Sequence, residues 1–164
     1  MTTTTLKSLA TIRTLIEQGW TQGSFRGEDN PEKPPCYCLM GAVYHEAGAD
    51  VLDTVACSKI SRGAVTFALA AAVRAVAPLQ DGPVRSPRAS VIHFNDEIAL
   101  ERGHVLDVID AAIAPIADAI AAYQAIAAAR LARDVARDAN LFWPTPEHAT
   151  AMCSAEKALA DLEA

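Results

Sequence analysis

The stretch 104–127, HVLDVIDAAIAPIADAIAAYQAIA, decides the fold class of this chain. When the sequence is advanced by 100° per residue, seven of its apolar side chains fall within an arc of about 80°. These residues are Val105, Ile109, Ile113, Ile116, Ile120, Tyr123 and Ala127. Asp107, Asp110 and Asp118 lie on the opposite side. We therefore expect a long amphipathic helix, buried along the first face and exposed to water along the second.

Pro115 lies inside this helical pattern and has no N–H to donate. We expect it either to kink the long helix or to divide it into two helices in tandem. Further helices are predicted at 5–18, from Cys36 or Cys38 to Gly48, at 61–76 with Ser61 as N-cap, and from Pro146 onward with Thr145 as N-cap. The segment VIHF, residues 91–94, is expected to be a short extended piece. The sequence thus predicts an all-α fold, a single-domain bundle (1–164) of about five helices.

Composition excludes several functional classes. The net charge is −6 at pH 7, so the chain lacks the excess of Lys and Arg that a nucleic-acid binder needs, and nucleic acid is not expected as a partner. A membrane is not expected either, because each aspartate of the long helix would cost roughly 2.5–3.5 kcal/mol near a bilayer centre. The N-terminus carries no secretory signal, which favours a cytoplasmic location and four free cysteine thiols.

Cysteine and histidine gather in CYCLMGAVYHEAG, residues 36–48. Cys36 and Cys38 form a C-x-C pair, with His45 and Cys57 further along the chain. A structural zinc site usually combines C-x(2–4)-C with a second close pair of Cys or His, and no second pair exists here. The sequence also lacks the glycine-rich phosphate-binding motifs. No metal and no cofactor are therefore expected.

A catalytic interpretation of the same stretch rests on Cys38. In the first turn of a helix, the dipole and free N–H groups favour a thiolate. His93 and Asn95 are two residues apart and would share one side of an extended strand, where His93 could act as base and Asn95 or Asp96 could orient it. This pattern predicts a cysteine-dependent hydrolase or transferase.

A structural interpretation of these residues is also open. Asn95 and Asp96 can bond backbone N–H groups of the loop before the long helix, as Asx turns do. Gly41 lies inside a predicted helix, where glycine is unfavourable unless another backbone packs closely against it. In this interpretation the residues anchor a loop and need no substrate.

Three stretches together resemble a known family. They are IEQGWTQGSF, CLMGAVYHEAG and VIHFNDEIALERGHVLDVIDAAI. They resemble a small family of actinobacterial and bacteriophage proteins of unknown function, with Gly-Trp, Cys-x-x-Gly-Ala and Trp-Asn-Asp motifs. The matching positions are Gly19, Trp20, Gly23, Cys38, Gly41, Ala42, Asn95, Asp96 and 105–113, with Phe94 in place of the Trp.

The resemblance covers about 6–113 and leaves 114–164 as a helical extension. It implies a bacterial cell or a phage-infected host as the setting, and it brings no activity with it. It also draws attention to Cys38, Asn95 and Asp96.

We expect a small cytoplasmic α-helical protein-interaction module, which a phage could encode to act on a host protein. It would bind another protein or itself, as a homodimer formed through the long helix. The alternative is the cysteine-dependent enzyme with Cys38, His93 and Asn95. A third hypothesis is an acidic decoy for a host nucleic-acid-binding protein.

Overall fold

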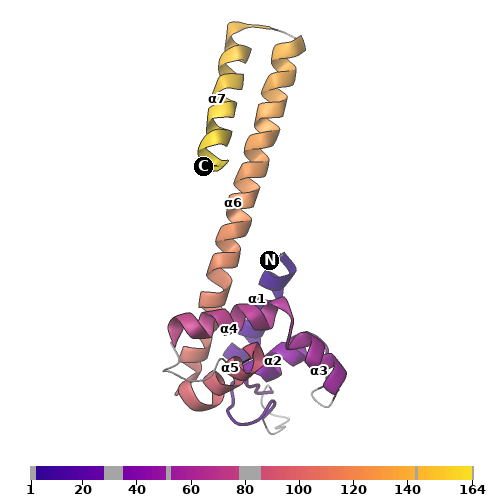
Figure 1. Ribbon diagram of the computed structural model, residues 1–164, viewed down its shortest axis with the longest axis vertical. Helices are drawn as coiled ribbons and strands as arrows, with labels where there is room; N and C mark the ends of the chain where they lie inside the picture. Colours follow the sequence, from indigo (N-terminus) through magenta and orange to yellow (C-terminus); the bar gives the residue numbers. More distant parts are fainter. Residues whose placement is uncertain (1–2, 28–34, 51–52, 78–85, 143, 164) are drawn as a thin grey trace. The chain divides into compact units, whose positions relative to one another are not determined.

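The computed structural model describes residues 3–27, 35–50, 53–77, 86–142 and 144–163 (Figure 1). Within these ranges the elements are α1 (Thr3–Gln18), α2 (Leu39–Glu46), α3 (Thr54–Ile60), α4 (Ala64–Val76), α5 (Pro87–His93), η1 (Phe94–Ile98, a π-helical turn), α6 (Arg102–Phe142) and α7 (Pro146–Glu163). In the same ranges there is no strand, only isolated bridges from Trp20 and Arg26 to Tyr37. The all-α prediction is confirmed, but the described residues form seven helices where about five were expected.

The chain divides into two compact units, residues 1–116 and 117–164. The first unit contains α1 to α5, η1 and the beginning of α6. The second contains the remainder of α6 and all of α7.

Helix α2 is central to the first unit. It contacts α1, α3 and α5, and its residues from Leu39 to Tyr44 are all buried. A helix that is apolar all round must be enclosed by other elements. Helix α1 contributes Leu9, Ile12 and Ile16 to this enclosure, at the spacing of one helical face, and all three are fully buried.

Helix α3 was not predicted, and Ser61 does not begin a helix. Asp53 caps α3, because its Oδ1 accepts hydrogen bonds from the N–H groups of Val55 and Ala56, both at 3.0 Å. Ser61 instead follows α3, and its hydroxyl donates to the Cys57 carbonyl at 2.6 Å. Helix α4 therefore begins at Ala64, although its end at Val76 agrees with the prediction.

The segment 91–94 is helical, so the prediction of an extended piece is wrong. Ser86 caps α5 through its hydroxyl, and Pro87 occupies the first turn, where its missing N–H costs nothing. The helix then continues into η1, closed by the bond from Ala99 N–H to the Phe94 carbonyl at 2.8 Å. Val91 and Phe94 are buried, so packing overrides the strand preference of these side chains.

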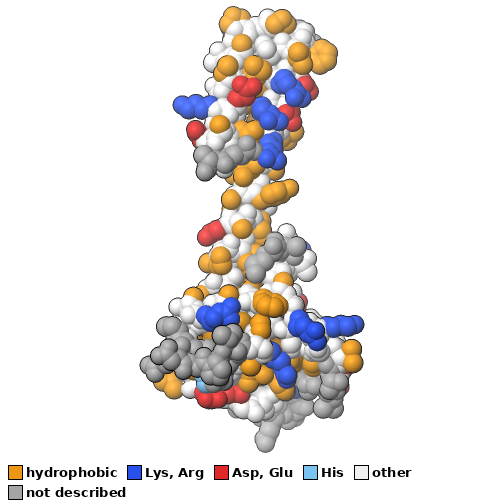
Figure 2. Space-filling view, viewed as in Figure 1, with side chains coloured by type: hydrophobic (Ala, Val, Ile, Leu, Met, Phe, Trp, Pro, Cys, Tyr) orange, Lys and Arg blue, Asp and Glu red, His pale blue; other side chains and the backbone are white. Residues whose placement is uncertain are grey.

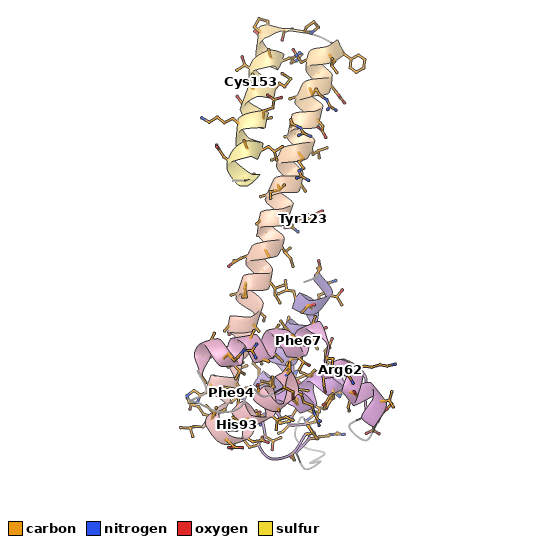
Figure 3. The ribbon with its side chains drawn as sticks, viewed as in Figure 1. Arg62, Phe67, His93, Phe94, Tyr123 and Cys153 are labelled. Atoms are coloured by element: carbon orange, nitrogen blue, oxygen red, sulfur yellow. The ribbon has the colours of Figure 1, made fainter. Side chains whose placement is uncertain are left out.

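Helix α6 runs unbroken through Pro115, so the prediction of two tandem helices is wrong. The predicted apolar face is buried only as far as Ile116, where the first unit ends. Beyond that point Tyr123, labelled in Figure 3, is 73% exposed. The three aspartates of the opposite face are exposed, as expected.

Helix α7 begins as predicted. The Thr145 hydroxyl accepts a hydrogen bond from the His148 N–H at 3.2 Å, and Pro146 is the first helical residue. Among the helices of the described ranges, none combines the length and the apolar character needed to cross a membrane.

Candidate functional site

Asn95 in η1 is fully buried and joins three segments of the first unit. Its Oδ1 accepts hydrogen bonds from Trp20 Nε1 at 2.8 Å and from the Leu39 N–H at 3.0 Å. Its Nδ2 donates to the Thr21 carbonyl at 3.3 Å and to Asp96 Oδ1 at 2.7 Å. Both partners of the oxygen are pure donors, and both partners of the nitrogen are acceptors here. The orientation of the amide is therefore fixed, and its hydrogen-bonding capacity is filled.

The loop after α1 is held by further bonds to η1. Asp96 Oδ1 accepts the Gly23 N–H at 3.0 Å. Gln22 Nε2 donates to the carbonyls of Asn95 and Ala99, at 2.9 and 2.6 Å. Carbonyls at the end of a helix lack helical partners, and Gln22 satisfies that of Asn95 in η1 and that of Ala99 directly after it. The loop and the turn therefore order each other.

Gly41 of α2 lies directly against the backbone of this loop. A Cβ at this position would overlap the carbonyl oxygen of Phe25. The Phe25 ring meets Tyr44 edge-on, with centroids 5.6 Å apart. The expectation that another backbone packs against Gly41 is correct, and the backbone is that of Phe25.

Cys38 is the N-cap of α2, and its Sγ accepts the Gly41 N–H at 3.2 Å. Burial raises the pKa of the thiol above its ordinary value, and the negative charge of Asp96 adds to the rise, although the Gly41 N–H opposes it. This direction is opposite to the one that the catalytic interpretation requires. Desolvation outweighs the helix terminus at this buried position.

His93 ends α5, and its Nδ1 lies 3.0 Å from Glu97 Oε1, one helical turn further on (His93 is labelled in Figure 3). Because the segment is helical, His93 and Asn95 do not share one side of a strand. Within the described residues, no hydrogen bond joins His93 to Cys38 or Asn95. The structure thus brings Cys38, Asn95 and Asp96 together and leaves His93 turned toward Glu97.

The arrangement has the properties of a structural anchor, but the loop that it holds follows α1, whereas the sequence predicted the loop before the long helix. Asn95 has no capacity left for a substrate, and Cys38 is buried, which raises the pKa of its thiol. Cys38, His93, Asn95 and Asp96 line neither of two cavities of about 350 and 270 Å³ in this unit. In the described part of the chain, no three His, Cys, Asp or Glu side chains are grouped to hold a metal ion.

Sequence reasoning missed the partners of this anchor and one polar cluster nearby. Trp20 and Gln22 are separated from η1 by more than seventy positions, so no local pattern connects them. Tyr37 and His45 line the cavity of about 270 Å³, with stacked rings 4.7 Å apart and Tyr37 Oη 3.3 Å from His45 Nδ1. Their spacing in the sequence carries no signal for this contact.

The chain belongs to a family of unknown function, DUF6197, which matches residues 1–115. The resemblance to a family without a known activity is thereby confirmed. The proposed motifs and the actinobacterial and phage origin stay predictions. No curated protein and no solved structure matches the chain.

Proposed function

We propose that this protein is an α-helical interaction module whose contact element is the second unit and whose partner is a second copy of the chain. The observation that carries the proposal is burial in residues 117–164. Leu159 is the one side chain that is buried among the described residues of this unit. Large apolar side chains lie exposed on the same unit, and Figure 2 shows hydrophobic side chains spread over its surface.

The two helices of this unit meet along a narrow seam. Partly or fully buried positions recur at alternating spacings of three and four residues on both helices, which is the repeat of a coiled-coil seam. They are Ile126, Ala129, Arg133, Ala136 and Asn140 on α6, and His148, Met152, Ala155 and Leu159 on α7. The seam occupies one face of α6, and Leu159 is the one side chain in it that is buried.

A second apolar face of α6 lies on the other side of the helix. Leu131, Val135 and Phe142 fall within about 40° of one another and about 180° from the seam. Their exposed fractions are 67%, 61% and 73%. A helix with apolar residues on opposite sides is typical of a helix that is covered twice. We name Leu131, Val135 and Phe142 the outer face.

The size of the unit favours a second copy as the cover. A segment of fewer than about 50 residues seldom supplies a sufficient core, and natural examples add disulfides, metals or oligomerisation. Cys153 is the sole cysteine of this segment, so no internal disulfide can form. Two helical hairpins packed through their outer faces form a four-helix bundle, a common and stable arrangement.

Charge on the second part of α6 is compatible with self-association. Arg133 and Arg137 lie near Asp134 and Asp138, with N–O distances of 2.9 to 4.0 Å. Both signs are therefore present on the same stretch, so a second copy can present an opposite charge to each. A strongly acidic or basic partner would meet repulsion from one set.

The proposal also includes a cytoplasmic location and an origin in a bacterium or a phage. In the case of a phage, a host protein would be a further partner. The cysteine-dependent enzyme has less support. It requires an acidic thiol near a histidine, whereas burial raises the pKa of Cys38.

The test compares two matched changes of exposed apolar residues. Val135→Glu places a charge on the outer face, whereas Leu100→Glu changes a residue of the first unit that is 83% exposed. The mass of the wild type and of both variants would be measured by sedimentation equilibrium over a hundredfold concentration range. We expect a dimer for the wild type and for Leu100→Glu, and at least about tenfold weaker association for Val135→Glu.

A wild-type mass of 17.3 kDa at every concentration would overturn the proposal. Equal weakening by both variants would also overturn it, since the contact would then not lie on the outer face. Circular dichroism of each variant checks that the helices persist.

A further inference from the structure

A cavity of about 350 Å³ lies in the first unit, away from Asn95 and Cys38. Its walls come from α3, the turn after it, the beginning of α4 and the start of α5. The side chains that matter for its chemistry are Ser58, Ser61, Arg62, Phe67, Ser86 and Arg88. Its volume lies within the range of cavities that bind small molecules.

The charge of this cavity is opposite to that of the whole chain. Arg62 and Arg88 both line it, and no Asp or Glu is among the described residues that do. Within the described residues neither arginine has an ion-pair partner, although the chain carries 20 acidic residues and a net charge of −6. Two guanidinium groups from separate segments therefore line one cavity, and none of the lining residues that the structure describes is a carboxylate. A fork of N–H donors of this kind suits the oxygens of a phosphate group.

Two serine hydroxyls add donors to the same cavity. Ser58 Oγ accepts from Arg62 Nη2 at 2.7 Å, and Ser86 Oγ accepts from the Ala89 N–H at 3.3 Å. Each of these hydroxyls therefore accepts a bond and keeps its own hydrogen for a further acceptor. Ser61 differs, because its hydroxyl already donates to the Cys57 carbonyl. The cavity thus presents two guanidinium groups and two O–H donors to an incoming anion.

Phe67 gives the cavity an apolar wall. It lies on α4, and its side chain is 48% exposed, although most of the neighbouring residues of that helix are buried (Arg62 and Phe67 are labelled in Figure 3). An exposed aromatic face beside cationic side chains is typical of a surface on which a flat ring stacks.

We propose that this cavity binds a small phosphorylated molecule that carries a flat ring, such as a nucleoside monophosphate. The phosphate contacts Arg62, Arg88, Ser58 and Ser86, and the ring lies on Phe67. This site is independent of the outer face on α6 and of the proposed self-association.

The test measures binding to the full chain by titration calorimetry with three probes: inorganic phosphate, adenosine monophosphate and adenosine. Arg62→Gln and Arg88→Gln each remove one charge from the cavity. Arg74→Gln is the matched control, because Arg74 is an exposed arginine of α4 outside the cavity. Phe67→Ala removes the proposed stacking surface and changes a half-exposed side chain, so the fold is retained.

We expect saturable binding of phosphate and at least about tenfold tighter binding of adenosine monophosphate, with no binding of adenosine. Arg62→Gln and Arg88→Gln should each weaken adenosine monophosphate about tenfold or more, and Arg74→Gln less than about twofold. Phe67→Ala should reduce its affinity to that of phosphate alone.

Absence of saturable binding of phosphate and of adenosine monophosphate up to about 20 mM would overturn the proposal. So would equal weakening by Arg74→Gln and Arg88→Gln, because the attraction would then be diffuse rather than local. Adenosine monophosphate that binds no tighter than phosphate would overturn the role of Phe67.

Discussion

The two units of this chain use apolar side chains in opposite ways. In residues 1–116 many of them form an enclosed core, with Leu9, Leu39, Leu69 and Ile109 at 0% exposure, although a few such as Leu100 lie outside it. In residues 117–164, side chains of the same kind lie outside, and Leu159 is the one buried side chain that the structure describes there. Apolar content alone therefore does not show where a core lies.

The difference also concerns what holds each unit together. The first unit combines a core with the buried hydrogen bonds of Asn95, which specify one arrangement of its loop. The second relies on helix propensity, which is high for its many alanines, and on a thin seam. Polar substitutions should thus be costly in the first unit and mild in the second.

Replacement of Asn95 should produce the largest effect. Asn95→Ala leaves the Leu39 N–H, the Trp20 Nε1–H and the Thr21 carbonyl without their side-chain partner in a buried place. We expect the free energy of unfolding to fall by about 3–4 kcal/mol, measured by urea denaturation.

The matched control is Gln124→Ala, which removes an exposed amide from the second unit's part of α6. It should change the free energy of unfolding by less than about 0.5 kcal/mol. A loss below about 1 kcal/mol for Asn95→Ala would show that water replaces its bonds and that the anchor is not a specifying element.

A smaller loss in the free energy of unfolding is expected at Gly41, where α2 packs against the backbone of the loop. Gly41→Ala places a Cβ against the Phe25 carbonyl, so α2 and the loop must separate. We expect the free energy of unfolding to fall by about 2–3 kcal/mol. Gly48→Ala serves as the comparison. Gly48 has a φ of +67° and open space around it. Its replacement by alanine should therefore lower the free energy of unfolding through backbone strain alone, by about 1 kcal/mol. Thermal denaturation of both variants measures the difference, and a similar loss in both would contradict the role of close packing.

Local signals predicted the parts of the fold that depend on local chemistry. The cap at Thr145 and Pro146 fixed the start of α7, and the spacing of Leu9, Ile12 and Ile16 located α1. The extended interpretation of 91–94 failed because burial of Val91 and Phe94 outweighs the preference of isolated residues. Pro115 did not end a helix, because a long helix tolerates one lost hydrogen bond when its neighbouring turns are intact.

The site was predictable only as a set of residues. The sequence drew attention to Cys38, Asn95 and Asp96, and the structure places them together. Their chemistry depends on partners that no spacing reveals: Trp20, which lies 75 positions from Asn95, and the burial of Cys38. The sequence places a cysteine at a helix start but does not show whether water reaches it. Burial or exposure of the thiol decides whether its pKa is raised or lowered.

The smallest expected effect concerns that thiol. Because the folded state raises the pKa of Cys38, the protonated form stabilises the native protein below the ordinary pKa of about 9. This contribution is lost as the pH rises through the folded value, so stability should decline above about pH 9. The measurement is the urea midpoint of the wild type minus that of Cys38→Ser, followed from pH 7 to 10.5. This difference isolates the contribution of the thiol to stability, because serine preserves the cap to the Gly41 N–H.

Iodoacetamide should label the exposed Cys153 quickly at pH 8 and Cys38 slowly. Fast labelling of Cys38 with a midpoint below about pH 8.5 would instead show an accessible, acidic thiol, and would favour the cysteine-dependent enzyme over the interaction module.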